Sequence, residues 1–256
     1  MKKIYDLTKS QYLTISKLTK NIGVKKYNRI LVEGEKCCSE LLYSNYKIDY
    51  FVVDANYLEK YNTITEQATQ KNIPIYQTKT NIFEKISDAK TPQGILAIAF
   101  PKVNNIFDKN KSFILMDNIS DPGNVGTIIR TAEWFGIYQI ILYGNGVYMY
   151  SPKIIRSTMG SIFRANMFQI KDANLLKNYL ADISLYAASL DSKVEINDIK
   201  PSNIFGLLVG NETRGISDDL KEYITESFYI KGYSQAESLN VAIATGISLF
   251  HFKNKF

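Results

Sequence analysis

The sequence feature that most constrains the fold is a buried strand that runs through a tight turn directly into an amphipathic helix. Residues 112–117 form a short apolar run that ends in an acid, and such a run predicts a buried strand. Asp121-Pro-Gly123 supplies turn chemistry, and Asn124 can cap the helix that follows. We expect this helix to end at Gly136. Its apolar face carries Ile128, Ala132 and Phe135.

The end of a strand followed by the start of a helix is where α/β proteins commonly place their chemistry. Asn124, Arg130 and Glu133 lie near this point and off the apolar face. Each also has an ordinary structural interpretation. Asn124 can be a simple helix cap, and Arg130 with Glu133 can form a solvated ion pair. Taken alone, the stretch indicates a candidate site and leaves both interpretations open.

Alternating strand and helix patterns on either side of this stretch predict an α/β protein of two domains, residues 1–105 and 106–256. The polar, irregular residues 101–111 are the expected linker. In the first domain the expected helices are 9–20, 37–43 and 57–71, and the expected strands are 30–33, 50–53, 73–76 and 95–99. In the second domain the further expected strands are 139–142, 185–188, 206–209 and 228–230, and the further helices are 151–164, 175–181 and 238–251.

The net charge of +6 is concentrated at the start of the chain. Residues 1–36 hold nine Lys or Arg against three acids, and this difference of 9 − 3 equals the excess of the whole chain. A basic segment of this kind is the electrostatic footprint of a polyanion-binding protein. Residues 21–29 are expected to form a basic loop that grips phosphate and stacks a base. Its candidate RNA-binding residues are Lys25, Lys26, Tyr27 and Arg29. A merely solvated, lysine-rich start is the alternative.

Several other classes of protein are not supported. The chain has 45% hydrophobic residues but no run as long as a membrane span and no signal segment, so we expect a cytoplasmic protein without membrane contact. Adjacent Cys37 and Cys38 are expected to be buried on a helix. With His251 as the only histidine, neither a metal site nor a Ser-His triad is expected. Gly144-Asn-Gly146 lacks the third glycine of a dinucleotide fingerprint.

Three stretches in order resemble the motifs of the SpoU/TrmH-type RNA ribose 2′-O-methyltransferases of the SPOUT superfamily. The first is the opening stretch, with its strand-end acid, D-P-x-N-x-G pattern, an Arg six residues after the Asn, and a closing Phe-Gly. The second is Gly210-Asn-Glu-Thr-Arg-Gly-Ile-Ser217, and the third is Glu237-Ser-Leu-Asn-Val241. Arg156-Ser-Thr-Met-Gly-Ser161 resembles a further segment of the family. Residues 29–36 and 91–97 resemble the substrate-binding domain that precedes the methyltransferase domain in many relatives.

The resemblance implies a fold and an assembly. The first domain would be similar to the ribosomal-protein L30e fold, which binds RNA, and the second would be a SPOUT domain with a deep trefoil knot. Members of the family work as homodimers with the active site at the subunit interface. The apolar C-terminal helix fits such an interface or a core equally well.

The resemblance also implies methyl transfer from S-adenosylmethionine to a ribose 2′-hydroxyl of ribosomal or transfer RNA, with ribosomal RNA favoured. The catalytic residues would be Arg130, Asn124, Glu212, Ser238 and Asn240. The cofactor-binding residues would be Gly210, Asn211, Gly215, Ile230, Ser238, Leu239 and Asn240. Arg156 would join the RNA-binding residues. The alternative is a non-catalytic RNA-binding protein that keeps the knotted fold.

Some positions depart from the family pattern or allow simpler interpretations. Thr158 and Ala242 stand where relatives usually have Ser, and Lys231 stands at a usual Pro. Gly210 and Gly215 can simply allow tight turns, while Ser238 can be a helix N-cap. Glu212 can favour a helix entry, and Asn240 can bond locally. The family's arginine is usually assigned to activate the hydroxyl. A guanidinium resists deprotonation, so we expect Arg130 to bind phosphate and stabilise a developing alkoxide.

Overall fold

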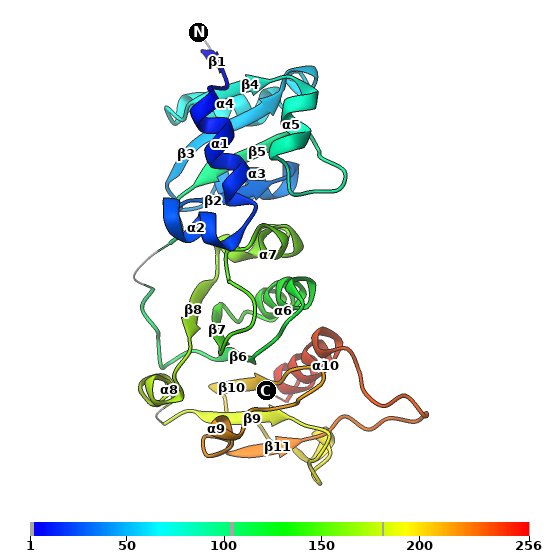
Figure 1. Cartoon of the computed structure of the whole chain (residues 1–256). Helices are drawn as coiled ribbons and strands as arrows, with labels where there is room; N and C mark the ends of the chain where they lie inside the picture. Colours follow the sequence, from blue (N-terminus) through cyan, green and yellow to red (C-terminus); the bar gives the residue numbers. More distant parts are fainter. Residues whose placement is uncertain (1–2, 103–104, 181, 256) are drawn as a thin grey trace. The chain divides into compact units, whose positions relative to one another are not determined.

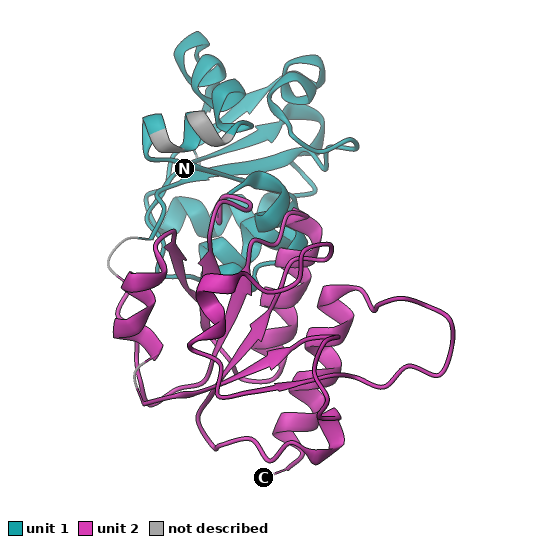
Figure 2. Cartoon of the chain, turned by 60° about the horizontal axis from the view of Figure 1, so that its bottom comes forward, with its two compact units in different colours: residues 1–104, 150–164 teal, residues 105–149, 165–256 magenta. Residues whose placement is uncertain are grey.

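The computed structural model describes residues 3–102, 105–180 and 182–255 (Figure 1). The chain forms two compact units (Figure 2). Unit 1 comprises residues 1–104 and 150–164, and unit 2 comprises residues 105–149 and 165–256. The side chains of Asn21, Ile22 and Lys25 lie outside the described part of the structure.

Unit 1 is an α/β unit around a mixed five-stranded sheet of order β1-β4-β3-β5-β2. Its strands are β1 Ile4–Asp6, β2 Ile30–Glu33, β3 Ile48–Asp54, β4 Ile75–Thr78 and β5 Ile95–Ala99. Its helices are α1 Lys9–Leu18, α2 Asn21–Tyr27, α3 Glu35–Leu42, η1 Ala55–Tyr57, α4 Asn62–Gln70 and α5 Thr80–Ile86, besides the segment described below. Strands β1, β4 and β3 are parallel, and β5 runs antiparallel to both β3 and β2. Both cysteines are free and buried on α3 as expected, and burial raises the pKa of the Cys37 thiol to about 11.

The basic stretch of residues 21–29 differs from its prediction as a loop. Its first seven residues form α2, which ends at Asn28 in the left-handed conformation with φ 49°. Val24 is buried on this helix. The helix was not predicted because, among its described side chains, Val24 is the buried apolar one, and because a left-handed Asn supplies the stop usually supplied by Gly.

Residues 150–164 form α7, Pro152–Ser157, and the short helix η2, Ser161–Phe163, and they pack in unit 1. A single helix over 151–164 was expected. The chain instead turns at Met159 and Gly160, whose φ values are 51° and 99°. Buried apolar side chains hold this inserted segment in unit 1, namely Tyr150, Ile154, Ile155, Ile162 and Phe163.

Unit 2 contains a six-stranded sheet in which all described pairings are parallel (Figure 1). The strands are β6 Phe113–Asp117, β7 Gln139–Tyr143, β8 Asn166–Ile170, β9 Ser184–Ala188, β10 Phe205–Val209 and β11 Glu226–Phe228. The helices are α6 Pro122–Trp134, α8 Ala173–Leu180, η3 Ile196–Asp198, α9 Asp218–Lys221 and α10 Val241–Lys253. None of the described helices is long and apolar enough to cross a membrane. The two units confirm the expected α/β class.

The strand order β11-β9-β10-β6-β7-β8 reverses direction between β6 and β10. From β6 the chain moves outward through β7 and β8, and then returns on the other side to form β9, β10 and β11. In open parallel sheets, ligands bind outside the carboxyl ends of the strands at such a switch point. The loops that follow β6 and β10 are therefore the place to look for a site.

Candidate active site

The start of α6 is shaped by Asp121, which is the N-cap and not Asn124 as expected. The Oδ1 atom of Asp121 accepts a hydrogen bond of 2.9 Å from the backbone N–H of Asn124. Pro122 occupies the first turn, where its missing N–H costs nothing. Because Asp121 caps the helix, the side chain of Asn124 is available for other contacts.

The side chain of Asn124 joins the three motifs through hydrogen bonds. Its Nδ2 atom donates to Oε1 of Glu212 at 2.7 Å, and its Oδ1 atom accepts from Nδ2 of Asn240 at 2.9 Å. Asn240 is also the N-cap of α10, where Ser238 was the expected cap. Its Oδ1 atom accepts from the N–H groups of Ala242 and Ile243 at 2.9 and 3.3 Å. We call Asn124, Glu212 and Asn240 the amide cluster.

The loop after β10 is a closed ring. Asn211 and Gly215 exchange two backbone hydrogen bonds of 2.9 Å. The side chain of Asn211 accepts from the N–H groups of Thr213 and Arg214, both at 3.0 Å. A Cβ at Gly210 would lie 2.5 Å from the Gly215 carbonyl oxygen, so the ring requires glycine there. Gly215 has φ 68°, and no described atom lies within 4 Å of where its Cβ would be. Open space therefore adjoins the backbone of this ring.

Arg130 takes no part in the hydrogen bonds of the amide cluster. Its side chain is exposed on α6 and makes no hydrogen bond or ion pair with any side chain that the structure describes. All residues from 231 to 240 are exposed, and the loop they form, orange in Figure 1, projects from the rest of unit 2. It carries Ser238 and Leu239, while Ile230 just before it is half-buried. The structure thus brings together Asn124, Glu212 and Asn240, and it leaves Arg130 and Ser238 outside.

Three RNA-binding candidates of unit 1, Lys26, Tyr27 and Arg29, take part in contacts between a cation and an aromatic ring. Nζ of Lys17 lies 3.2 Å from the hydroxyl of Tyr27. The guanidinium of Arg29 lies over the ring of Phe100 at 3.4 Å from its centre, and its Nε donates to Asp49 at 2.8 Å. Lys47 approaches the same ring, with Nζ at 4.7 Å. Lys17 belongs to the basic segment noted in the sequence, whereas Lys47 and Phe100 were not singled out, because they lie beside β3 and β5 and far from that segment in the chain.

Arg156 is engaged within unit 1 by two carboxylates. Its Nη1 lies 3.4 Å from Glu33, and its Nη2 lies 2.8 Å from Asp88. The side chain of Glu33 is only 1% exposed and also accepts from the backbone N–H of Asp88. Burial of a carboxylate is costly without partners, so Arg156 compensates Glu33. A role in RNA binding stays a prediction for Arg156, as it does for Lys26, Tyr27 and Arg29. The side chain of Lys25 lies outside the described residues.

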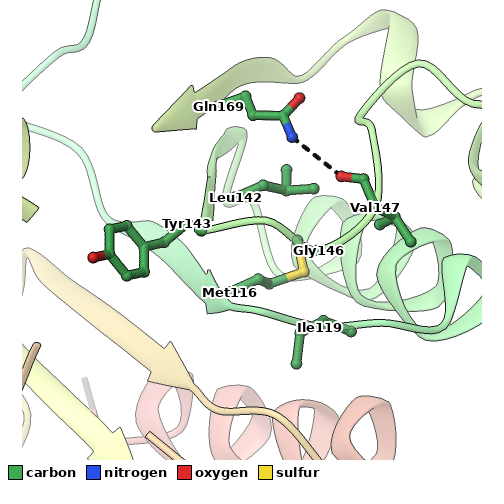
Figure 3. Close-up of a pocket in the computed structure, with 8 residues that line it drawn as sticks. Met116, Ile119, Leu142, Tyr143, Gly146, Val147 and Gln169 are labelled. Atoms are coloured by element: carbon green, nitrogen blue, oxygen red, sulfur yellow. Dashed lines mark hydrogen bonds between the residues drawn. The ribbon is translucent and has the colours of Figure 1, made fainter. Parts of the chain in front are cut away.

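A small hollow lies at the carboxyl ends of β6 and β7 (Figure 3). Its lining residues are Met116, Ile119, Leu142, Tyr143, Gly144, Gly146, Val147 and Gln169. Gln169 bridges it by donating to the carbonyl of Val147 at 3.2 Å. With about 10 Å³ of space the hollow has room for roughly one water-sized sphere. It is too small for a nucleoside. Among the described residues, no group of three His, Cys, Asp or Glu could hold a metal ion.

Comparison with known proteins gives matches along most of the chain. The SpoU rRNA Methylase family model matches residues 111–250, and the MRM3-like substrate binding domain model matches residues 14–97. The chain is 30% identical over 229 residues to the 23S rRNA (guanosine(2553)-2'-O)-methyltransferase RlmP of Bacillus subtilis, which covers 89% of this chain and 90% of that protein. It is 29% identical to an uncharacterized tRNA/rRNA methyltransferase of Borreliella burgdorferi, over 77% of this chain and 94% of that protein. An AdoMet-bound rRNA methyltransferase from Sinorhizobium meliloti superposes with a TM-score of 0.85 at 26% identity, covering 98% of this chain and 97% of that one.

The amide cluster predicts an order of stability among substitutions of Asn124. Asn124→Ala removes both side-chain hydrogen bonds and should lower the free energy of unfolding by about 1 kcal/mol. Asn124→Asp should cost more at pH 7, because it sets a second carboxylate against Glu212. This extra cost should disappear in acid, where one carboxyl is protonated. Urea unfolding at pH 7 and near pH 4 measures both effects.

The matched control for this series is Asn197→Asp. Asn197 donates to Oε1 of Glu195 at 2.7 Å in the same unit, but the two residues are only two positions apart in the chain, so this contact joins no distant segments. This substitution should change stability by less than Asn124→Asp does. Equal effects of the two substitutions at both pH values would show that the amide cluster does not form in solution.

Proposed function

Because this chain belongs to the SpoU rRNA methylase family, we propose that it transfers a methyl group from S-adenosylmethionine to a ribose 2′-hydroxyl of structured RNA, with ribosomal RNA favoured over transfer RNA. The observation that carries the proposal is the amide cluster. Hydrogen bonds between Asn124, Glu212 and Asn240 join the three motifs at the switch point of the sheet. The joint presence of Asn124, Arg130, Glu212 and Asn240 speaks against the alternative of a non-catalytic RNA-binding protein.

The ring after β10 fits the cofactor. S-adenosylmethionine supplies an electrophilic methyl group on a sulfonium. Gly210, Asn211 and Gly215 would hold the cofactor largely through backbone groups, with open space beside Gly215 to receive it. The remaining cofactor residues would be Ile230, Ser238, Leu239 and Asn240. Ser238 and Leu239 sit on the exposed loop of residues 231–240, so this loop would have to fold toward the ring when the cofactor binds.

Arg130 would act on the RNA. A 2′-hydroxyl holds its proton too tightly to react at neutral pH without help. Its proton passes to solvent water as the oxygen attacks the methyl carbon, and the electrons of the broken carbon–sulfur bond return to sulfur, which leaves the demethylated cofactor. Negative charge that develops on the oxygen as the proton departs must be stabilised. A guanidinium beside that oxygen supplies this stabilisation and can also hold the neighbouring phosphate with two parallel hydrogen bonds. Asn124, Glu212, Ser238 and Asn240 would position the reacting groups. A displacement of this kind needs no metal, since positioning supplies much of the rate.

A homodimer is the assembly that we propose. Helix α10 packs against α6 and still leaves large apolar side chains in solvent. Ile243 is 55% exposed and Phe250 is 62% exposed, and Trp134 at the end of α6 is 85% exposed. Exposed large apolar side chains on two packed helices are a feature of protein interfaces. A second copy seated on it would bring another α6, and with it another Arg130, close to the cluster.

Unit 1 would bind the RNA substrate. Its supporting features are the match of residues 14–97 to a substrate binding domain and the lysines around Tyr27 and Phe100. The RNA-binding residues would be Lys25, Lys26, Tyr27, Arg29 and Arg156. The proposed domains are residues 1–105 and 106–256, with residues 150–164 of the second packing in unit 1. The first domain would be L30e-like, and the second would hold a trefoil knot. We place the protein in the cytoplasm, as the sequence predicts.

The activity is tested with methyl-labelled S-adenosylmethionine and RNA from cells that lack the gene. Ribosomal RNA should take up label, and transfer RNA should take up much less. A methylated 2′-oxygen cannot attack the adjacent phosphate, so alkaline hydrolysis should leave the label in resistant dinucleotides. Mass spectrometry of these dinucleotides identifies the nucleotide. A protein that binds the RNA but transfers no label would be the non-catalytic alternative.

Arg130→Ala should lower turnover roughly a hundredfold, because this is the usual cost of losing one donor to an oxyanion. The dissociation constant of the cofactor should stay the same. Arg130→Lys should fail almost as badly, because lysine keeps the charge and loses the planar fork. Lys177→Ala on the surface of α8 is the control for a lost charge. If Arg130→Lys kept most of the activity and its rate rose with pH, the residue would be a base instead.

Substitution of the apolar face of α10 should separate the dimer. Ile243→Glu with Phe250→Glu would bury two unpaired charges at the proposed interface, which costs several kcal/mol. Light scattering should give twice the chain mass for the wild type and the single chain mass for the variant. Leu190→Glu, at a residue that is 68% exposed elsewhere in unit 2, is the matched control and should stay dimeric. A wild type that is monomeric at micromolar concentration would contradict the assembly.

A further inference from the structure

A buried carboxylate at the end of β6 holds the loop that follows β10. Asp117 is fully buried, and its two oxygens accept three hydrogen bonds. The backbone N–H of Ser217 donates at 2.6 Å, the hydroxyl of Ser217 donates at 2.9 Å, and Nδ2 of Asn118 donates at 2.8 Å. No basic side chain among the described residues pairs with Asp117. A buried charge without a counter-ion is tolerated only when hydrogen bonds satisfy it, so these three contacts are obligatory for the carboxylate.

The hydroxyl of Ser217 binds Asp117 and does not cap the helix that Ser217 begins. Ser217 is the N-cap of α9, and a cap serine usually turns its hydroxyl toward the first turn of its own helix. Here it makes no such bond, and the hydroxyl is directed to Asp117 instead. The side chain of Ser217 therefore connects the end of β6 to the loop after β10 and does not stabilise α9.

Asn118 adds a second tie between the same elements. It is held in the left-handed conformation at φ 49°. Its carbonyl oxygen accepts from Nδ2 of Asn211 at 2.9 Å, and its Oδ1 accepts from the backbone N–H of Asn145 at 3.0 Å. A Cβ at Gly144 would lie only 2.2 Å from that Oδ1. Glycine at this position is therefore needed to make room for the side chain of Asn118.

From these contacts we infer that Asp117, Asn118 and Ser217 form a latch that fixes the ring of residues 210–215 in the shape that binds the cofactor. The latch holds the ring at both ends, through Asn211 at its start and Ser217 just beyond it. The three residues do not touch the reacting groups and are positioning residues. The inference rests on the proposed function, which assigns the cofactor to this ring.

The consequence is a specific split between binding and turnover. A ring that is free to change shape must be ordered when the cofactor binds, and this ordering weakens the affinity. Once the cofactor is bound at saturation, the same ring shape is restored. Loss of the latch should therefore raise the dissociation constant and KM for the cofactor and leave kcat nearly unchanged. This split distinguishes the latch from Arg130, whose loss should lower turnover alone.

The test compares Ser217→Ala with Ser217→Thr in the full chain, using calorimetric titration with S-adenosylmethionine and its demethylated product. Ser217→Ala should raise the dissociation constant about tenfold or more, the scale of one hydrogen bond to a charged group. Ser217→Thr keeps the hydroxyl and should restore most of the affinity. Ser202→Ala, which removes a hydroxyl bonded to Tyr186 and Ser184 ahead of β10, should change nothing. Tryptic cleavage after the exposed Arg214 should be faster in Ser217→Ala than in the other variants.

A second variant protects the test against misfolding. Asn118→Gly keeps the left-handed backbone easily and removes only the side chain, so it should also weaken cofactor binding while the circular dichroism spectrum is unchanged. An unchanged dissociation constant in both variants, or equal losses in Ser217→Ala and Ser217→Thr, would overturn the latch. A wild type that does not bind the cofactor would overturn the proposed function and this inference with it, and the wild-type titration alone tells these failures apart.

Discussion

The parallel pairing of β6 with β10 is the constraint on which the site depends. Parallel neighbours end at the same edge of a sheet, so their following loops start side by side however far apart they lie in the chain. Asn118 and Asn211 are 93 positions apart and are joined by a hydrogen bond at this edge. Because the connections leave β6 and β10 toward opposite sides, no strand crosses the space between the two loops. Backbone topology therefore creates the site before any side chain contributes to it.

The chemistry of the amide group explains why residue 124 is an asparagine. Glu212 carries only acceptors, so its neighbour must donate. The side-chain oxygen Oδ1 of Asn240 already accepts from the first N–H groups of α10. The side chain of Asn240 can therefore only donate to residue 124, through Nδ2. A side chain that donates to one partner and accepts from the other is required, and Asn supplies both from one rigid plane. Asn240 in turn links the start of α10 to the site, because the same residue caps the helix and contacts Asn124.

Features that depend on interactions within one segment could be predicted from the sequence, and features that depend on contacts between distant segments could not. The apolar runs of β6, β7, β9 and β10 identified these strands because burial acts on each segment by itself. The motifs identified Asn124, Glu212 and Asn240 one by one, but only the strand order brings them together. The caps at Asp121 and Asn240 were missed, because Asn124 and Ser238 have equal intrinsic preference and the choice depends on distant partners. For the same reason the sequence could not show that Arg130 makes none of the hydrogen bonds of the cluster.

The path of the chain also limits how the functions of the two units can be tested separately by truncation. Unit 1 takes up residues 150–164, which lie between β7 and β8 of unit 2, so the chain passes between the units three times. Ile154, Ile155 and Phe163 are buried by this packing. Removal of residues 1–104 would expose these side chains, at a cost of about 1.5–3 kcal/mol for each one, and would leave Arg156 without Glu33 and Asp88. A shortened chain would then lose RNA binding through damage to its fold as well as through missing lysines. The contribution of unit 1 to RNA binding has to be measured with surface substitutions in the whole chain, where the buried insert stays in place.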